Sequence, residues 1–168
     1  MKKISLIVLC LVFLLNFKAP LFSHCEIPCG IYNDEMRFEL MMEHIKTIEK
    51  SVKQIIHLSE ENWKLVKSSN SPDPVNNNQL VRWITNKEKH AEEIQHIVSQ
   101  YFLTQRIKLY DSNEPEKHKK YMDQLSLCHK ILIYAMKTKQ SLDLSNVKEL
   151  KKNVTEFKKI YLGLKEEK

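Results

Sequence analysis

Apolar residues recur along most of the chain at alternating spacings of three and four, the period of an amphipathic α-helix. The first such stretch runs from Asn33 toward Val66, either unbroken or interrupted around Ser59. Asn33 is suited to cap this helix, and the carboxylates of Asp34 and Glu35 in its first turn favour the helix dipole. Its expected core positions are Phe38, Met41, Ile45, Ile48, Val52 and Ile55.

Three further helical stretches follow, separated by polar loops. They are expected over Asn78–Tyr110, Glu116–Thr138 and Ser145–Leu162, and Gly163 stands where a helix stop is needed. Their expected core positions are Leu80, Ile84, Lys87, Ala91, Ile94, Val98 and Tyr101 in the second, Tyr121, Leu125, Cys128, Leu132 and Ala135 in the third, and Val147, Leu150, Val154, Phe157 and Tyr161 in the fourth.

Four amphipathic helices joined by short polar loops favour an antiparallel up-and-down four-helix bundle. The chain of 168 residues holds two glycines, fewer than the turns of a β-rich fold would need. The 145 residues after position 23 (168 − 23) are enough to bury a core. We therefore expect an all-α fold, with residues 33–168 as the bundle.

Residues 1–23 have the composition of a secretion signal. Two lysines precede an apolar stretch, and Ser23 is a small residue directly before His24. The apolar stretch is shorter than a comfortable membrane span. Cleavage before His24 is therefore expected, with no membrane association of the mature protein. A cut after Ala19 and a lipoprotein signal are the competing interpretations.

Export to the periplasm or the extracellular space is the expected destination, with an organelle lumen or the cytoplasm as alternatives. The net charge of +6 includes three leader lysines and no leader acid, so the remaining chain carries +3 (6 − 3). A charge this small argues against a nucleic-acid partner. It would modestly assist the approach of a small anion.

The chemically distinctive stretch is residues 24–32, which read His-Cys-Glu-Ile-Pro-Cys-Gly-Ile-Tyr. The thiolates of Cys25 and Cys29 and the imidazole of His24 suit nickel, copper or zinc. A tetrahedral zinc site would need a fourth ligand from far away. If cleavage frees the amine of His24, that amine and the backbone nitrogen of Cys25 complete a planar set of two nitrogens and two sulfurs. Such a set favours nickel(II) or copper(II).

The same nine residues resemble the nickel hook of nickel superoxide dismutases, which reads His-Cys-Asp-x-Pro-Cys-Gly-x-Tyr at the mature N-terminus. The chain matches every fixed position except the aspartate, where Glu26 keeps the carboxylate. The resemblance implies one nickel ion per subunit, bound by His24, Cys25 and Cys29. It also implies conversion of superoxide anion to dioxygen and hydrogen peroxide by Ni(II)/Ni(III) cycling, in a four-helix bundle that assembles into a homohexamer.

The resemblance assigns roles to the other hook residues. Pro28, after a cis bond from Ile27, and Gly30 shape the hook, and Glu26 fixes its backbone. Tyr32 lies beside the vacant axial side of the nickel, where its hydroxyl limits access and guides protons.

Glu39 is the candidate outside the hook. By resemblance it corresponds to a glutamate of the first helix that bonds the hook imidazole, supported by an arginine of the second helix. The nearest counterparts of that arginine are His90 and Arg82. The alternative for Glu39 is a solvated helix carboxylate.

Two other functions remain open. One is a nickel- or copper-binding module without turnover, and the other is an exported helical protein with a Cys25–Cys29 disulfide. Cys128 is expected to be a buried thiol without chemistry, and the Asn153-Val154-Thr155 glycosylation pattern falls inside a predicted helix. The helical histidines are expected to pack or face solvent; they are His44, His57, His90, His96, His118 and His129.

Overall fold

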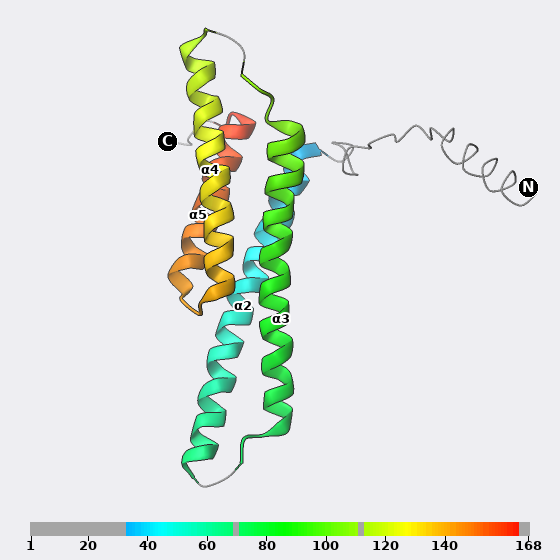
Figure 1. Cartoon of the computed structure of the whole chain (residues 1–168), viewed down its shortest axis with the longest axis vertical. Coiled ribbons are helices and arrows are strands. Elements are labelled where there is room, and N and C mark those ends of the chain that lie inside the picture. The colour runs from blue at the N-terminus through cyan, green and yellow to red at the C-terminus, as the bar shows by residue number, and fades with distance from the viewer. Residues whose placement is uncertain (1–32, 69–70, 111–112, 165–168) are drawn as a thin grey trace, which may run out of the picture.

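The computed structural model describes residues 33–68, 71–110 and 113–164. Its α-helices are α2 (Asn33–Lys67), α3 (Pro74–His96), α4 (Pro115–Gln140) and α5 (Leu144–Leu162), and a π-helix, η1 (Ile97–Arg106), continues α3. No strand occurs among these residues. α2 and α4 each pack against both α3 and α5, so successive helices are antiparallel neighbours in a ring (Figure 1). The predicted all-α four-helix bundle is confirmed.

α2 matches the sequence prediction most closely. It runs for 35 residues without a break at Ser59. All six of its predicted core residues are at most 4 % exposed. Its first residue, Asn33, has a positive φ of 71°, a conformation that asparagine tolerates better than most residues.

The second helix begins earlier than predicted, at Pro74 instead of Asn78. The Asp73 carboxylate caps it by accepting a hydrogen bond of 2.8 Å from the Val75 N–H. Proline is tolerated in the first turn because its missing N–H would have no partner there. Asp73-Pro74 was therefore a helix-start signal that the prediction treated as part of a loop.

The same helix ends earlier than predicted, at Arg106 instead of Tyr110, where Ile107 becomes extended. Its last ten residues form the π-helix, closed by a 2.8 Å hydrogen bond from the Ile107 N–H to the carbonyl of Phe102, five residues back. The wider turns of a π-helix change which side chains face inward. The consecutive residues Tyr101 and Phe102 are both buried.

α4 and α5 lie within two residues of their predicted bounds. Gly163 adopts a left-handed φ of 68° and ends α5, as predicted. Cys128 is fully buried, and burial raises the pKa of its thiol to about 12, so the thiol stays protonated. Asn153 is buried inside α5 and donates a 2.7 Å hydrogen bond to the carbonyl of Glu149, which leaves its amide unavailable for glycosylation.

An aromatic cluster fills the core at the end of the bundle where α2 begins and α5 ends. Phe38, Phe102, Phe157 and Tyr161 are all in mutual contact, with ring centroids 4.9 to 5.7 Å apart. Tilted and edge-on pairs of this kind contribute about 1 kcal/mol each beyond their buried area. The cluster therefore holds the start of α2 against η1 and α5.

The other end of the molecule is a two-helix extension. α2 and α3 continue well beyond the loop that joins α4 to α5 (Figure 1). Lys87 marks the border: it is 4 % exposed, and its ammonium donates hydrogen bonds to the carbonyls of Lys139 (2.6 Å) and Ser141 (3.3 Å). The prediction that Ile84 lies in the core is wrong. It is 41 % exposed, because α4 and α5 end before reaching it.

A pair of histidines joins α2 to α3 on the side of the bundle. The Nδ1 atoms of His44 and His90 lie 2.7 Å apart, so one imidazole donates a hydrogen bond to the other. Burial, together with the neighbouring His90, lowers the pKa of His44. The bond cannot form when both rings are protonated, because each Nδ1 then carries a proton.

We expect this pair to make stability fall in mild acid. Because the pKa of His44 is lower in the folded protein than its ordinary value of 6.5, the unfolded chain takes up that proton more readily. The stabilisation is complete above pH 6.5 and is lost as the pH falls through the folded-state pKa. Urea-unfolding midpoints between pH 7.5 and 5 should fall less steeply in His44→Gln than in the wild type.

The matched control is His129→Gln, which removes an exposed histidine of α4. Its midpoints should follow the wild-type slope. Equal slopes in wild type and His44→Gln would contradict the assignment of this pH dependence to the histidine pair.

Candidate functional site

The predicted site residues fall into two groups. Glu39 lies on α2, whereas the hook residues His24, Cys25, Glu26, Cys29 and Tyr32 lie outside the described residues. Within the described part of the chain, no cluster of three or more His, Cys, Asp or Glu side chains could hold a metal ion. The combination of soft donors that suits nickel is thus confined to the sequence at 24–29.

The start of α2 fixes where the hook joins the bundle. Tyr32 is bonded to Asn33, and successive Cα atoms are about 3.8 Å apart. Residues 24–32 are therefore joined in sequence to the first turn of α2.

A cluster around Asp34 holds that first turn. The Asp34 carboxylate accepts hydrogen bonds from the hydroxyls of Tyr101 (2.5 Å) and Tyr161 (2.6 Å), and from Nε (3.1 Å) and Nη2 (2.6 Å) of Arg106. Tyr101 and Arg106 belong to η1, and Tyr161 belongs to α5. One side chain, 13 % exposed, thus ties three elements together at the end of the bundle where α2 begins.

The electrostatics of this cluster favour the ionised form of the Asp34 carboxylate. Burial alone would raise the pKa of Asp34, but the hydrogen bonds from Arg106, Tyr101 and Tyr161 outweigh burial and hold it below its usual range. Burial and the bond to Asp34 raise the pKa of Tyr161 to about 12, and the same causes raise the pKa of Tyr101. Both phenols therefore stay protonated and act as donors to an ionised carboxylate.

Sequence reasoning missed this cluster. Asp34 was interpreted only as a carboxylate that favours the helix dipole, and Arg106 had no assigned role. The available signal was a charged residue in the first turn of α2 together with two tyrosines on predicted core stripes, since a buried tyrosine hydroxyl needs a partner. The pairing itself depends on the π-helix, which the spacing of apolar residues does not indicate.

Glu39 has a cation partner, but a different one from those predicted. Its carboxylate accepts a 2.6 Å hydrogen bond from Lys158 of α5, whose ammonium also lies 3.4 Å from Glu35. The hydrogen bond from Lys158 is the main cause of the lowered pKa of Glu39. His90 instead contacts His44.

Arg82, the other predicted partner of Glu39, lies on the two-helix extension, where it lines a surface groove with Trp83. Among the described residues, the cation paired with Glu39 is therefore neither of these two candidates. That cation comes from the last helix. The carboxylate of Glu39 is 62 % exposed, so it can also reach a group outside the bundle.

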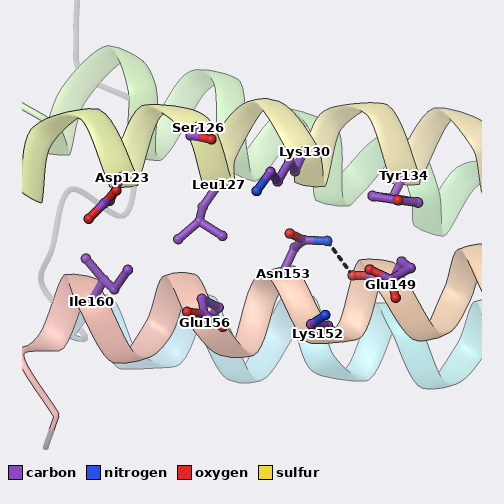
Figure 2. A pocket seen from close by; sticks show the side chains of 10 residues that line it. All are labelled: Asp123, Ser126, Leu127, Lys130, Tyr134, Glu149, Lys152, Asn153, Glu156 and Ile160. Atoms are coloured by element: carbon purple, nitrogen blue, oxygen red, sulfur yellow. Dashed lines mark hydrogen bonds between the residues drawn. The ribbon is translucent and has the colours of Figure 1, made fainter. Parts of the chain in front are cut away.

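A groove of about 500 Å³ runs between α4 and α5 and has a different chemistry. Figure 2 shows side chains of both helices lining the space between them, including Lys130 of α4 and Glu156 of α5. Charges of both signs line it, and neither cysteine nor histidine is among the lining residues. It therefore offers no soft donor for nickel.

An all-helical bundle with imidazole and thiolate donors on a segment before its first helix defines a helical metalloprotein. The chain matches the family model of nickel-containing superoxide dismutase over residues 19–165. It therefore belongs to the nickel-containing superoxide dismutase family. It is an oxidoreductase that uses nickel and takes superoxide as its substrate. Searches of curated proteins and of solved structures found no significant match.

No helix among the described residues is both long and apolar enough to cross a bilayer.

The Asp34 cluster leads to a stability prediction. Asp34→Asn removes the negative charge and leaves Arg106 without its ionic partner, while the amide can accept fewer hydrogen bonds. We expect the free energy of unfolding to fall by about 2 kcal/mol, measured by urea denaturation.

Asp143→Asn is the matched control. Asp143 caps α5 by accepting a hydrogen bond from the Ser145 N–H, and asparagine caps about as well, so the expected cost is only a few tenths of a kcal/mol. If the two variants lose stability equally, Asp34 is only another helix-start carboxylate.

Proposed function

We propose that residues 24–32 form the nickel site of this superoxide dismutase. The observation that carries the proposal is the nine-residue pattern, which lies inside the segment matched by the family model and directly before α2. The chemistry of the donors fits the metal, because two thiolates with amine and amide nitrogens favour planar nickel(II). Cys25 and Cys29 supply the sulfurs, and His24 supplies its amine and its imidazole.

Nickel held by these residues would supply one-electron redox chemistry, by which one superoxide becomes dioxygen and the next becomes hydrogen peroxide. The thiolates of Cys25 and Cys29 and the deprotonated amide of Cys25 would donate charge to the metal and lower its reduction potential, so that superoxide could both reduce and oxidise it. The hydroxyl of Tyr32 restricts access and delivers protons toward the product peroxide. Glu26 fixes the backbone of the hook.

Glu39 orients the imidazole of His24 in this proposal, and Lys158 holds Glu39. The support is the 2.6 Å contact between Lys158 and Glu39, which keeps the carboxylate ionised and near the start of α2. Lys158 is a compact point charge shared between Glu35 and Glu39, whereas an arginine would bind a carboxylate through two parallel bonds. Glu39 should therefore keep more freedom to adjust to the imidazole.

The free amine of His24 requires removal of residues 1–23. We infer that this segment is a leader that directs export to the periplasm or the extracellular space. Assembly into a homohexamer, as the family resemblance implies, belongs to the same proposal. The support for it is indirect, since several large apolar side chains of the described residues are exposed, among them Met36 and Leu40 near the start of α2.

The first test is the intact mass of the protein purified from its own host, under native and then denaturing conditions. We expect a chain that begins at His24 and holds one nickel ion. A chain that keeps any residue before His24, or one that lacks metal and is two mass units lighter through a Cys25–Cys29 disulfide, would contradict the proposal.

The second test separates the enzyme from a passive metal-binding module. Cys29→Ser should lose superoxide dismutase activity at least about a hundredfold, because losing even a residue that only orients a metal ligand costs up to that much. Cys128→Ala, which changes only the buried thiol of α4, should keep its nickel and its activity. Circular dichroism should show an intact bundle in both variants. Nickel binding without turnover in the wild type would favour the passive module, and full activity in Cys29→Ser would exclude this ligand set.

A further inference from the structure

The two-helix extension carries an apolar surface that nothing in the described chain covers. We define the tip face as Trp63 and Val66 of α2 with Val81 and Ile84 of α3. These side chains are 61, 46, 64 and 41 % exposed, respectively. Four large apolar residues exposed on one short hairpin are typical of an interaction surface.

The tip face continues the core side of the bundle. The core spacing of α2 ends Ile48, Val52, Ile55, and further steps of four, three and four lead to Ser59, Asn62 and Val66. On α3 the same spacing leads back from Ala91 through Lys87 to Ile84. α4 and α5 lie beside the bundle part of α2 and α3 but do not extend along the two-helix extension (Figure 1). Lys87 lies at this border, because its ammonium bonds the carbonyls of Lys139 and Ser141 at the end of α4.

The lengths of the helices favour a second copy of this chain as the cover. α2 has 35 residues and α3 with η1 has 33 (23 + 10), whereas α4 has 26 and α5 has 19. Each copy thus lacks two helices over the stretch where its own hairpin is bare. Two hairpins placed face to face and antiparallel would each supply the missing pair, which completes a four-helix bundle with two-fold symmetry.

The charges on α2 also favour this arrangement. Glu60 and Lys67 are exposed and seven residues apart, so they lie on the same side of the helix and flank Trp63. In an antiparallel pair of α2 helices centred between Trp63 and Lys64, each Glu60 meets the Lys67 of the other copy. The described tip from Ile56 to Ile84 has three acidic side chains (Glu60, Glu61, Asp73) and three basic ones (Lys64, Lys67, Arg82), so two tips do not repel.

We propose that the tip face is a two-fold contact between two copies of this chain, centred on Trp63. The contact does not depend on nickel. Trp63 lies 30 residues along α2 from Asn33, about 45 Å from the end that carries the hook. Variants of the tip face should therefore leave nickel content unchanged.

The test is the mass of the full mature protein in solution, measured by analytical ultracentrifugation over a range of concentrations. Trp63→Glu should weaken the contact at least about tenfold and reduce the assembled mass by half at low concentration. Leu109→Glu is the matched control, because Leu109 is 90 % exposed in the segment between η1 and α4, at the opposite end of the molecule. Its mass should equal that of the wild type.

Charge exchange tests the register. Glu60→Lys and Lys67→Glu should each weaken association by about fivefold, and the double variant should restore it. A wild-type mass that Trp63→Glu does not change, or a double variant no better than the single ones, would overturn the proposal. Binding of wild-type protein to lipid vesicles that is lost in Trp63→Glu, without a change in mass, would overturn it in favour of a membrane-facing surface.

Discussion

The Asp34 carboxylate is the point on which the working end of the molecule depends. It lies in the first turn of α2 and accepts hydrogen bonds from residues that are 67, 72 and 127 positions away in sequence. The aromatic cluster packs the same elements together, but apolar packing fixes how close they lie more than how they are oriented. The hydrogen bonds to the carboxylate also fix their relative orientation. A short segment that carries a metal can be placed reproducibly only if the helix it precedes starts at a fixed point.

The fold could be predicted from the spacing of apolar residues because each helix has one buried stripe. The prediction failed where a residue with core spacing has no helix packed over it, and where the helix is not an α-helix. Ile84 keeps the spacing but is 41 % exposed, since α4 and α5 are shorter than α2 and α3 and do not reach it. The π-helix changes the period itself, so the spacing could indicate neither the end of η1 at Arg106 nor the joint burial of Tyr101 and Phe102. Asp73-Pro74 could have been interpreted correctly, because its signal is local.

The candidate metal site stays a prediction, and it could be made from the sequence for the opposite reason. The donors His24, Cys25 and Cys29 are consecutive or nearly so, and their chemistry needs no knowledge of long-range packing. The residues proposed to support them are not local. Lys158 is 119 positions from Glu39, and lysines are too common on helix surfaces for sequence alone to select one. Ligands that lie close together in sequence can thus be recognised from the sequence alone, whereas the partner of Glu39 depends on which helix ends lie together in the fold.

The burial of Cys128 affects how well the enzyme resists oxidation by hydrogen peroxide, its own product. Hydrogen peroxide oxidises the thiolate form of cysteine, first to a sulfenic acid and then irreversibly. A thiol with a pKa of about 12 and no exposed surface has almost no thiolate with which peroxide can react. The cysteine inside the bundle is therefore insulated from the oxidant that each catalytic cycle releases, and oxidative ageing should fall on the exposed thioethers of Met36 and Met122 before it reaches the core.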